Sequence, residues 1–582
     1  MAETLVLCGG VKRPGSDSAL QIALEGRSRN ITLKLEDLSK RLVKNVPDLL
    51  IDLIEIATFV YCADQTTSRG GECQSGMGVD WRREFRFVIP VRNLEYWAQE
   101  TTIEALCDAL SFLSDDEYVF EFEKASNAAS FESYLELGGE GTTAFRPDEV
   151  LLFSGGLDSL AGSVEELSAG HKKVALVSHR SSPKIYEHQK RLVDELKCRF
   201  PGSVMHFPVQ ITKHGMKSLE HTQRSRSFLY ATIAFVVAYI LGNTRIRFFE
   251  NGVVSINLPI AEQVVGSRAT RTTHPLVLAQ FRAFFSAVAG KPIEIENPYI
   301  WKTKSDVVRT IAERGCGDLI RDSVSCTRMH DATRLHTHCG SCSQCIDRRF
   351  GVLAADCAKD DPEEMYKVDL LTGERAAPVD QTMAESYVRT AIELREMAEV
   401  SFFSRFGGET GRVCSGFPLL KADDVARRVL ELHHQHGQAI LKVLTAAVKD
   451  HSDDLVLGRI APTSVLMMAV ARGAAPMLSK ISGRTDPLLS LIGTEPLGTS
   501  EVSATHAKNR EVTVSGTGAR RSRPSRERAL RAINEIYPQG VPDEATVPNA
   551  SLLNKVGEKL NQEGLLGVSD DTILRAAGRR RK

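Results

Sequence analysis

The feature that most constrains the fold is a short apolar run that ends in a glycine turn, at residues 150–160. It reads Val-Leu-Leu-Phe-Ser-Gly-Gly-Leu-Asp-Ser-Leu, and a helical pattern follows from Leu160. This order predicts a buried strand, a tight turn and the start of a helix. Two adjacent glycines permit positive φ and a close backbone approach, so several amides can point at one spot where the helix dipole begins. The turn is therefore a predicted phosphate site.

Strand and helix patterns alternate after this turn, and the alternation sets the fold class. Apolar runs typical of strands occupy residues 174–178, 203–209 and 245–249. Helical patterns lie between them, and the one at 228–241 is apolar enough to be a buried helix. Such βαβ order predicts an α/β fold with a central doubly wound, mostly parallel sheet and ligands at the carboxyl ends of its strands. We expect this domain to cover residues 146–358.

The residues before this domain, 1–145, are expected to form a mixed α/β accessory module. Residues 31–35, 85–91 and 118–122 alternate apolar and polar positions as half-buried strands do, and 49–61 is apolar enough for a packed helix. No catalytic signature stands out in this segment. We therefore interpret it as a scaffold or a partner-binding module.

The residues after the domain, 359–500, are predicted to form a helical domain. An apolar stripe recurs there at three- and four-residue intervals, as in a helix that faces a core. Its members are Val425, Val429, Leu432, His436, Ile440 and Val443. Neighbouring helical positions do not face one another, so we expect no metal site at the histidines of this stretch. Those histidines are His433, His434 and His436.

The end of the chain is expected to be a flexible basic linker, residues 501–524, and a small helix-turn-helix-like module, residues 525–582. Small and polar residues dominate before residue 519. Three short helix patterns then follow between arginine clusters at 520–526 and 579–582. A basic three-helix module can make weak contacts to nucleic acid through phosphates. Docking to a protein and a solvated tail are the alternatives.

Composition excludes several classes of protein. The 582 residues carry a formal net charge of −1, so no global field favours nucleic acid or a membrane surface. The first residues lack the basic and apolar regions of a secretory signal, and the longest apolar run is shorter than the roughly 20 residues of a spanning helix. We expect a cytoplasmic protein that does not bind membranes. Whether it forms an oligomer stays open.

A dense cysteine cluster lies near the end of the predicted α/β domain. Cys339, Cys342 and Cys345 are separated by two residues each, and Cys326 lies upstream. This spacing lets adjacent thiolates reach one tetrahedral Zn²⁺ at about 2.3 Å, and four thiolates leave no open position. We therefore predict a structural zinc site with Cys326 as the fourth ligand. Three histidines inside the loop are alternatives to Cys326, namely His330, His336 and His338.

The glycine turn resembles the pyrophosphate loop of the PP-loop ATPases, which split ATP between its α and β phosphates. It is not a Walker A loop, because no Gly-Lys-Ser/Thr follows it. By this resemblance the turn would hold the leaving pyrophosphate, and Asp158 would support the loop or bind Mg²⁺. The residues expected to bind ATP are Ser154, Gly155, Gly156, Leu157, Asp158, Ser159 and Ser178.

The turn and the cysteine cluster, in this order, resemble the 7-cyano-7-deazaguanine synthase (QueC) family. Arg226-Ser-Phe-Leu is similar to the family's Arg-Asn-x-x-Phe-Leu segment, and Lys304 stands where the family has a lysine. Arg348 and Arg349 follow the last cysteine, as an arginine does in the family. The resemblance covers residues 148–358, so the chain looks like the enlarged variants of bacterial antiphage defence clusters.

The resemblance implies an ATP-dependent enzyme that forms C–N bonds. In the family, 7-carboxy-7-deazaguanine attacks the α-phosphate of Mg-ATP and pyrophosphate leaves. Ammonia then displaces AMP to give an amide, and a second activation dehydrates the amide to the nitrile. Charge on the pyrophosphate needs cationic stabilisation in a dry site. The residues expected to act in catalysis are Asp158, Lys304 and Arg226. Those expected to contact the acid are Arg224, Arg271 and His274. The cofactors implied are ATP, Mg²⁺ and a structural Zn²⁺.

The sequence departs from the family near the acid. The family's Tyr-Pro-Asp-Cys-Arg segment is replaced by Arg-Ala-Thr-Arg-Thr-Thr-His-Pro at 268–275, and its Tyr-Gly-Gln by Ser178-His-Arg. A bulkier nucleophile than ammonia is therefore conceivable, and we expect acyl transfer to a partner protein's amine in antiphage defence. The alternatives are release of a free amide or nitrile and a non-enzymatic nucleotide sensor. An amidotransferase is weaker, because position 2 is Ala2 and not a nucleophilic cysteine.

Overall fold

The computed structural model divides the chain into two compact units, Met1–Thr485 and Asp486–Lys582. The first contains several hydrophobic clusters and the second has a small core of its own. The residues described are 3–34, 46–69, 82–125, 145–259, 270–471 and 524–562, with 573 and 577, but without 17, 27, 171, 181, 221–223, 329–332, 334, 539–540, 543–546 and 548.

A six-stranded sheet forms the centre of the first unit. Its order is β10 (Glu294–Glu296), β9 (Arg245–Arg247), β6 (Glu149–Leu152), β7 (Val174–His179), β8 (Val204–Lys213) and β3 (Ile31–Lys34). The first five strands pair in parallel, and β3 pairs with β8 antiparallel. The prediction of a mostly parallel α/β sheet is therefore confirmed. The edge strand from residues 31–34 was predicted as a strand but not as a member of this sheet.

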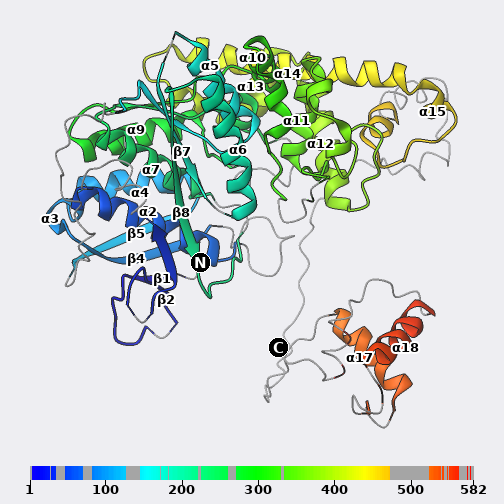
Figure 1. Cartoon of the computed structure of the whole chain (residues 1–582), viewed down its shortest axis with the longest axis horizontal. Coiled ribbons are helices and arrows are strands. Elements are labelled where there is room, and N and C mark those ends of the chain that lie inside the picture. The colour runs from blue at the N-terminus through cyan, green and yellow to red at the C-terminus, as the bar shows by residue number, and fades with distance from the viewer. Residues whose placement is uncertain are drawn as a thin grey trace, which may run out of the picture. The chain divides into compact units, whose positions relative to one another are not determined.

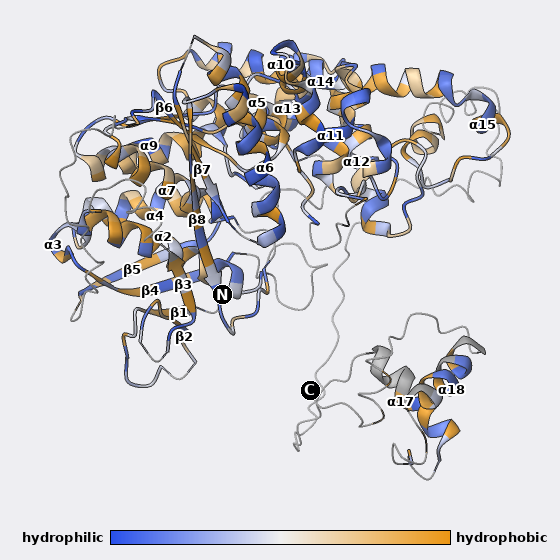
Figure 2. Cartoon of the chain, viewed as in Figure 1, coloured by the Kyte–Doolittle hydropathy of each residue, from blue (hydrophilic) through white to orange (hydrophobic). Residues whose placement is uncertain are grey.

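Helices cover both faces of the central sheet, because β6 is apolar on both sides. Val150 belongs to the core on one face and Leu151 to the core on the other. The first face is covered by α7 (Arg226–Ile240) and α9 (Pro275–Ala289). The second face carries α5 (Leu157–Ser168), α6 (Pro183–Arg199) and α10 (Lys304–Glu313). Figure 2 shows more hydrophilic colour on α6, which borders solvent, than on α7. This arrangement is doubly wound, as predicted.

A second sheet, of four parallel strands, is built from the N-terminal residues. Its order is β2 (Leu20–Ile22), β1 (Glu3–Cys8), β4 (Glu84–Val91) and β5 (Glu117–Lys124). The helices of this segment are α2 (Asp48–Thr66), α3 (Leu94–Trp97) and α4 (Glu100–Ser114). Because α2 packs on α7 and α4 packs on α9, these helices lie between the two sheets (Figure 1). One continuous hydrophobic core joins both sheets.

The described remainder of the first unit is helical, and after residue 358 this agrees with the predicted helical domain as far as residue 471. Its short helices are α8 (Gly252–Ile256), η3 (Gly317–Asp322), η5 (Ala358–Asp360), η6 (Glu363–Met365) and α15 (Ser452–Val456). Its longer helices are α11 (Ser343–Ala354), α12 (Pro378–Leu394), α13 (Glu399–Ser415) and α14 (Ala422–Asp450). The helix α14 packs against α11, α12 and α13. Every member of its predicted apolar stripe is buried. A Cβ on Gly437 would lie 2.3 Å from the carbonyl oxygen of Ala391, so this glycine allows the close approach of α14 to α12.

The second unit contains two described helices, α17 (Pro524–Ile536) and α18 (Asn549–Gln562). They pack through Ala532, Ile533, Leu552, Val556 and Leu560, in agreement with two of the three predicted helices. The third prediction, at 570–577, falls almost wholly outside the described residues. The arginines at 520–523 and 579–581 lie outside them too.

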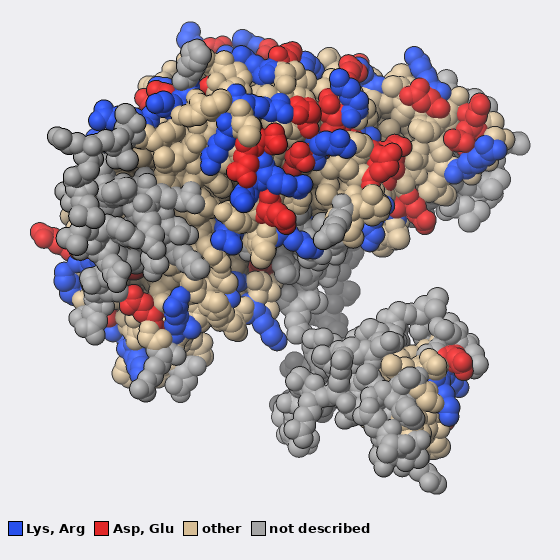
Figure 3. Space-filling model, in the orientation of Figure 1, with Lys and Arg blue, Asp and Glu red and all other residues tan. Residues whose placement is uncertain are grey.

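Charges of both signs are interspersed over the surface shown in Figure 3, in line with the small net charge. No helix within the described residues has both the length and the apolar character needed to cross a membrane.

Candidate functional site

The turn after β6 has the geometry that the two glycines predict. Gly155 has a φ of +83°, a left-handed conformation that side chains with a Cβ rarely adopt. Gly156 is the residue before α5 and is extended, with φ −85° and ψ 171°. The amide of Phe153 donates to the carbonyl of Val177 at 2.8 Å, so the turn leaves directly from the carboxyl end of the sheet. An anion at this end would meet backbone amides and a helix N-terminus together.

Two serine hydroxyls lie at the mouth of the turn. Ser154 Oγ accepts from the amide of Gly156 at 3.3 Å and lies 3.2 Å from Ser159 Oγ. Ser159 Oγ also donates to the carbonyl of Gly156 at 3.1 Å. The side-chain amide of Gln189, on α6, donates to the carbonyl of Ser154 at 3.0 Å and braces the turn from outside. Ser154 itself is exposed, so the turn is open to a ligand.

A buried ion pair joins this turn to α10. Lys304 is the first residue of α10, after a capping box made by Thr303 and Asp306. Its Nζ lies 2.7 Å from Asp158 Oδ2 and 3.1 Å from Asp347 Oδ2, with only 3% of the lysine exposed. Burial alone would lower the pKa of Lys304, but the two carboxylates raise it above its ordinary value. Lys304 therefore carries a full positive charge beside the turn.

Asp158 has one oxygen left over for a ligand. Its Oδ2 accepts hydrogen bonds from Lys304 Nζ and from the side-chain amide of Asn251. The same amide also donates to Asp347 Oδ2 at 3.4 Å. Asp158 Oδ1 is buried and has no hydrogen-bond partner among the described residues. Mg²⁺ binds through one or two carboxylates together with phosphate oxygens and water. Asp158 fits such an ion, as the sequence predicts.

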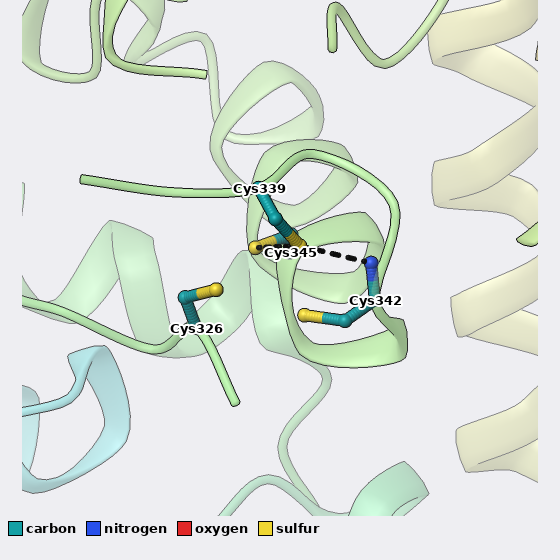
Figure 4. A group of neighbouring side chains, drawn as sticks. All are labelled: Cys326, Cys339, Cys342 and Cys345. Carbon is teal, nitrogen blue, oxygen red and sulfur yellow. Dashed lines mark hydrogen bonds between the residues drawn. The ribbon is translucent and has the colours of Figure 1, made fainter. Parts of the chain in front are cut away.

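The four cysteines converge in space. Their Sγ atoms all lie within 4.8 Å of one another, and Cys339 Sγ is 3.8 Å from Cys345 Sγ (Figure 4). Four thiolates at about 2.3 Å from one tetrahedral Zn²⁺ lie about 3.8 Å apart, so the cluster fits zinc. Among the described residues, Cys326 rather than His336 or His338 completes the cluster. His338 instead stacks on Tyr366, and His330 lies outside the described residues.

The segment that leads into the cysteine cluster is hydrogen-bonded to the glycine turn. The amide of Val324 donates to the carbonyl of Gly155 at 2.9 Å, and Ser325 Oγ accepts from the amide of Leu157 at 3.4 Å. Cys326 follows at once, so a metal held by the cluster would fix this segment against the turn. Arg348 supports the same segment, because its guanidinium donates to Ser323 Oγ at 2.7 Å.

Comparison with known families is consistent with this geometry. Residues 274–356 match the family model described as queuosine biosynthesis protein QueC. The domain is QueC-like. The matched stretch contains Lys304 and the four cysteines, whereas the glycine turn lies before it. The matched stretch covers 83 of the 582 residues. A search of curated proteins gave no match to this chain.

Arg348 and Arg349, which stand near the family's arginine, are structural in the QueC-like domain. Both bind Asp361, and Tyr366 OH donates to the same carboxylate at 2.7 Å. Burial alone would raise the pKa of Asp361, but Arg348 and its other partners lower it below the ordinary value. These side chains hold the zinc-binding loop together and are fully engaged with one another.

The other residues predicted to bind ATP or to supply positive charge are Ser178, Arg226 and Arg224. Ser178 is buried at the end of β7, where its Oγ donates to the carbonyl of Phe153 at 2.6 Å and so supports the turn from beneath. Arg226 begins α7, and its guanidinium lies 5.2 Å from the ring centre of Tyr230. Arg224 is buried and donates to the carbonyl of Ser114 on α4. Burial lowers the pKa of Arg224 to about 10.

Arg271 and His274 line one small hollow with Arg412 and Glu409 of α13. Arg271 donates to the carbonyl of Phe112 at 2.9 Å. His274 Nδ1 accepts from the amide of Leu276, so this nitrogen carries no proton. Burial, together with the nearby arginines, lowers the pKa of His274 to about 3, so the ring is neutral at pH 7.

Several residues of the site were not predicted from the sequence. Glu250 follows β9 and accepts from the hydroxyls of Thr272 and Thr273, which lie between Arg271 and His274. Burial and then the charge of Asp158 raise the pKa of the Glu250 carboxyl. This carboxyl therefore holds the two threonines that lie between the hollow's Arg271 and His274. Asp347 and Asn251 were not predicted either, because isolated polar residues in or beside helices form no motif. The only sequence signal for Asp347 is its place two residues after Cys345.

Proposed function

We propose that the QueC-like domain adenylates a deazapurine carboxylic acid with ATP and transfers the acyl group to an amine. The observation that carries the proposal is the ion pair of Lys304 with Asp158 at the mouth of the Ser154–Ser159 turn, 2.7 Å long and almost fully buried. An enzyme of the ATP-using QueC family needs a phosphate-binding turn and a fixed cation at one place.

In the first step, a carboxylate oxygen of the acid bonds to the α-phosphorus of ATP as the bond from that phosphorus to the leaving oxygen breaks. The products are an acyl adenylate and pyrophosphate. The turn and the N-terminus of α5 would hold the pyrophosphate, and Lys304 would offset the negative charge that develops on it. A Mg²⁺ bound by Asp158 would supply Lewis-acid polarisation of the phosphates.

In the second step, an amine nitrogen bonds to the acyl carbon, AMP leaves, and the nitrogen loses a proton. The proposal places this amine on a partner protein. Two features of the chain support a large acceptor: the altered 268–275 segment, and the helical and N-terminal parts added to the QueC-like domain. The biological setting proposed is antiphage defence in bacteria. With ammonia as acceptor, the product would be a free amide or, after a second activation and loss of water, a nitrile.

The test is pyrophosphate release. The protein is incubated with Mg-ATP and 7-carboxy-7-deazaguanine, with and without candidate partner proteins, and pyrophosphate, AMP, small products and intact partner masses are recorded. We expect Asp158→Asn to lower pyrophosphate release by about 100-fold or more, because it removes a charged ligand and unbalances Lys304. The matched control is Asp318→Asn, which loses a surface ion pair with Arg199 and should keep full activity.

The outcomes separate the alternatives. A mass increase on a partner, absent with Asp158→Asn, supports acyl transfer to protein. A small nitrile or amide without a mass change selects the free-product synthase. ATP binding without turnover, identical in wild type and Asp158→Asn, would select a nucleotide sensor and end the enzymatic proposal.

A further inference from the structure

A chain of polar contacts runs from α12 to the ion pair of Lys304 with Asp158. Tyr387 lies on α12, after the end of the stretch that matches QueC. Its hydroxyl donates to Asp347 Oδ1 at 2.9 Å. The other oxygen of Asp347 lies 3.1 Å from Lys304 Nζ, and Lys304 in turn lies 2.7 Å from Asp158. The α12 hydroxyl is thus three contacts away from the glycine turn.

The ring of Tyr387 is held by two other helices. It stacks on Phe350 of α11, with ring centres 5.8 Å apart and planes at 15°. The ring of His436, on α14, meets it edge-on at 5.5 Å. A side chain packed on both sides keeps its hydroxyl at a fixed place. The helices α11, α12 and α14 therefore together set where Asp347 finds its hydrogen bond.

Asp347 is only 3% exposed, so its charge must be satisfied inside the protein. Its hydrogen-bond and ion-pair partners come from three elements: Lys304 from α10, Asn251 from the start of α8 and Tyr387 from α12. Asp158 of α5 shares two of these partners. Lys304 is therefore held between two carboxylates, and the place of one of them depends on Tyr387.

We propose that Tyr387 is a positioning residue, which orients Asp347 and through it the Lys304 ammonium for ATP activation. The helix α12, which lies after the stretch that matches QueC, then contributes a residue that supports the ATP site. This inference rests on the proposed function for its kinetic consequence, though not for its geometry. Without the hydroxyl, Asp347 Oδ1 would be buried without a partner, so the carboxylate would turn and Lys304 would move with it.

The kinetic test is Tyr387→Phe, which keeps the ring and removes only the hydroxyl. We expect kcat for pyrophosphate release to fall about tenfold with KM for ATP unchanged, because the lysine acts on charge that develops in the transition state. The matched control is Thr410→Val on α13, which loses a buried hydroxyl that donates to the carbonyl of Phe406. Equal kcat in Tyr387→Phe and wild type, or an equal loss in both variants, would overturn the inference.

A second readout does not depend on turnover. The ¹⁵N resonance of the Lys304 ammonium can be assigned by its loss in Lys304→Arg and followed in the full chain. We expect this resonance to shift in Tyr387→Phe and to stay in place in Thr410→Val. If the resonance shifts in Tyr387→Phe but the wild type releases no pyrophosphate, the positioning role stands and the proposed function fails. An unmoved resonance removes the positioning role whatever the activity.

Discussion

At the scale of single residues, the site depends on a glycine that leaves room for the side chain of Lys304. Gly351 lies on α11, and a Cβ built there would come 2.3 Å from Lys304 Cγ and 3.0 Å from Lys304 Cβ. The helix therefore carries a poor helix former where the stem of the buried lysine passes.

We predict that Gly351→Ala lowers pyrophosphate release although alanine is the better helix former. The added methyl must displace the Lys304 stem, and a shift of about 1 Å at a reacting centre costs on the order of 100-fold in rate. The control is Gly408→Ala on α13, where nothing lies within 4 Å of the new Cβ. This control should keep its activity and gain about 0.5–1 kcal/mol in unfolding free energy, read from denaturant midpoints. An active Gly351→Ala would mean that Lys304 tolerates displacement.

The sequence was enough to find the residues whose spacing reports their chemistry. The turn and the four cysteines are recognisable because their motifs are short and fixed by geometry. Lys304 was found by resemblance, and the structure pairs it with Asp158. Asp347, Asn251 and Tyr387 were not found, because they meet only after distant helices pack. Arg224 reaches the carbonyl of Ser114, which no sequence pattern could indicate.

At the scale of elements, the segment that leads into the four cysteines and the glycine turn form one assembly. The bonds of Val324 and Ser325 to the turn come directly before Cys326, and Arg348 holds the residues before them. The cysteine spacing predicts the metal site but not this contact, since a spacing says nothing about neighbours far away in the chain. Likewise, the alternation at residues 31–34 predicts a strand, but not that it pairs with β8.

We predict that Cys345→Ser removes the bound zinc and the ATP-dependent activity together. Loss of a structural metal is among the few changes that cost more than about 4 kcal/mol, and here it would also release residues 324–326 from the turn. Zinc content by atomic emission and pyrophosphate release are the measurements. The matched control is Cys198→Ser, an exposed cysteine on α6, which should keep both. Full activity in zinc-free protein would show that the turn holds its shape alone.

At the scale of the whole first unit, the N-terminal sheet and the central sheet depend on each other. They share one hydrophobic core, and a buried charge network crosses between them. Asp64 of α2 pairs with Arg83 and accepts from the amide and the hydroxyl of Ser225, just before α7. Arg83 also pairs with Asp116 at 2.7 Å. A boundary near residue 145 is predicted from linker-like composition, which cannot reveal whether the segments on its two sides share a core.

We predict that Asp64→Asn destabilises the whole first unit, because it leaves Arg83 and Arg69 with less buried countercharge. Breaking a buried ion pair costs about 3–5 kcal/mol. A single lowered transition, seen by circular dichroism and by loss of ATP binding together, is the expected result. The control is Asp318→Asn, which loses a surface ion pair with Arg199. Two separate transitions in Asp64→Asn would mean that the sheets unfold independently.

The lowered pKa of the Asp64 carboxyl leads to a prediction of how stability depends on pH. Burial alone would raise the pKa of Asp64, but Arg83, the bonds from Ser225 and Arg69 lower it below its ordinary value. A lowered folded pKa means that the stabilisation is fully present above the unfolded pKa of about 3.9 and is lost as the pH falls through the folded pKa. Wild type should therefore lose more stability than Asp64→Asn between about pH 4 and pH 2, because the variant has already lost this group. Parallel curves for the two proteins in denaturant titrations over this range would show that the Asp64 network does not link the two sheets by charge.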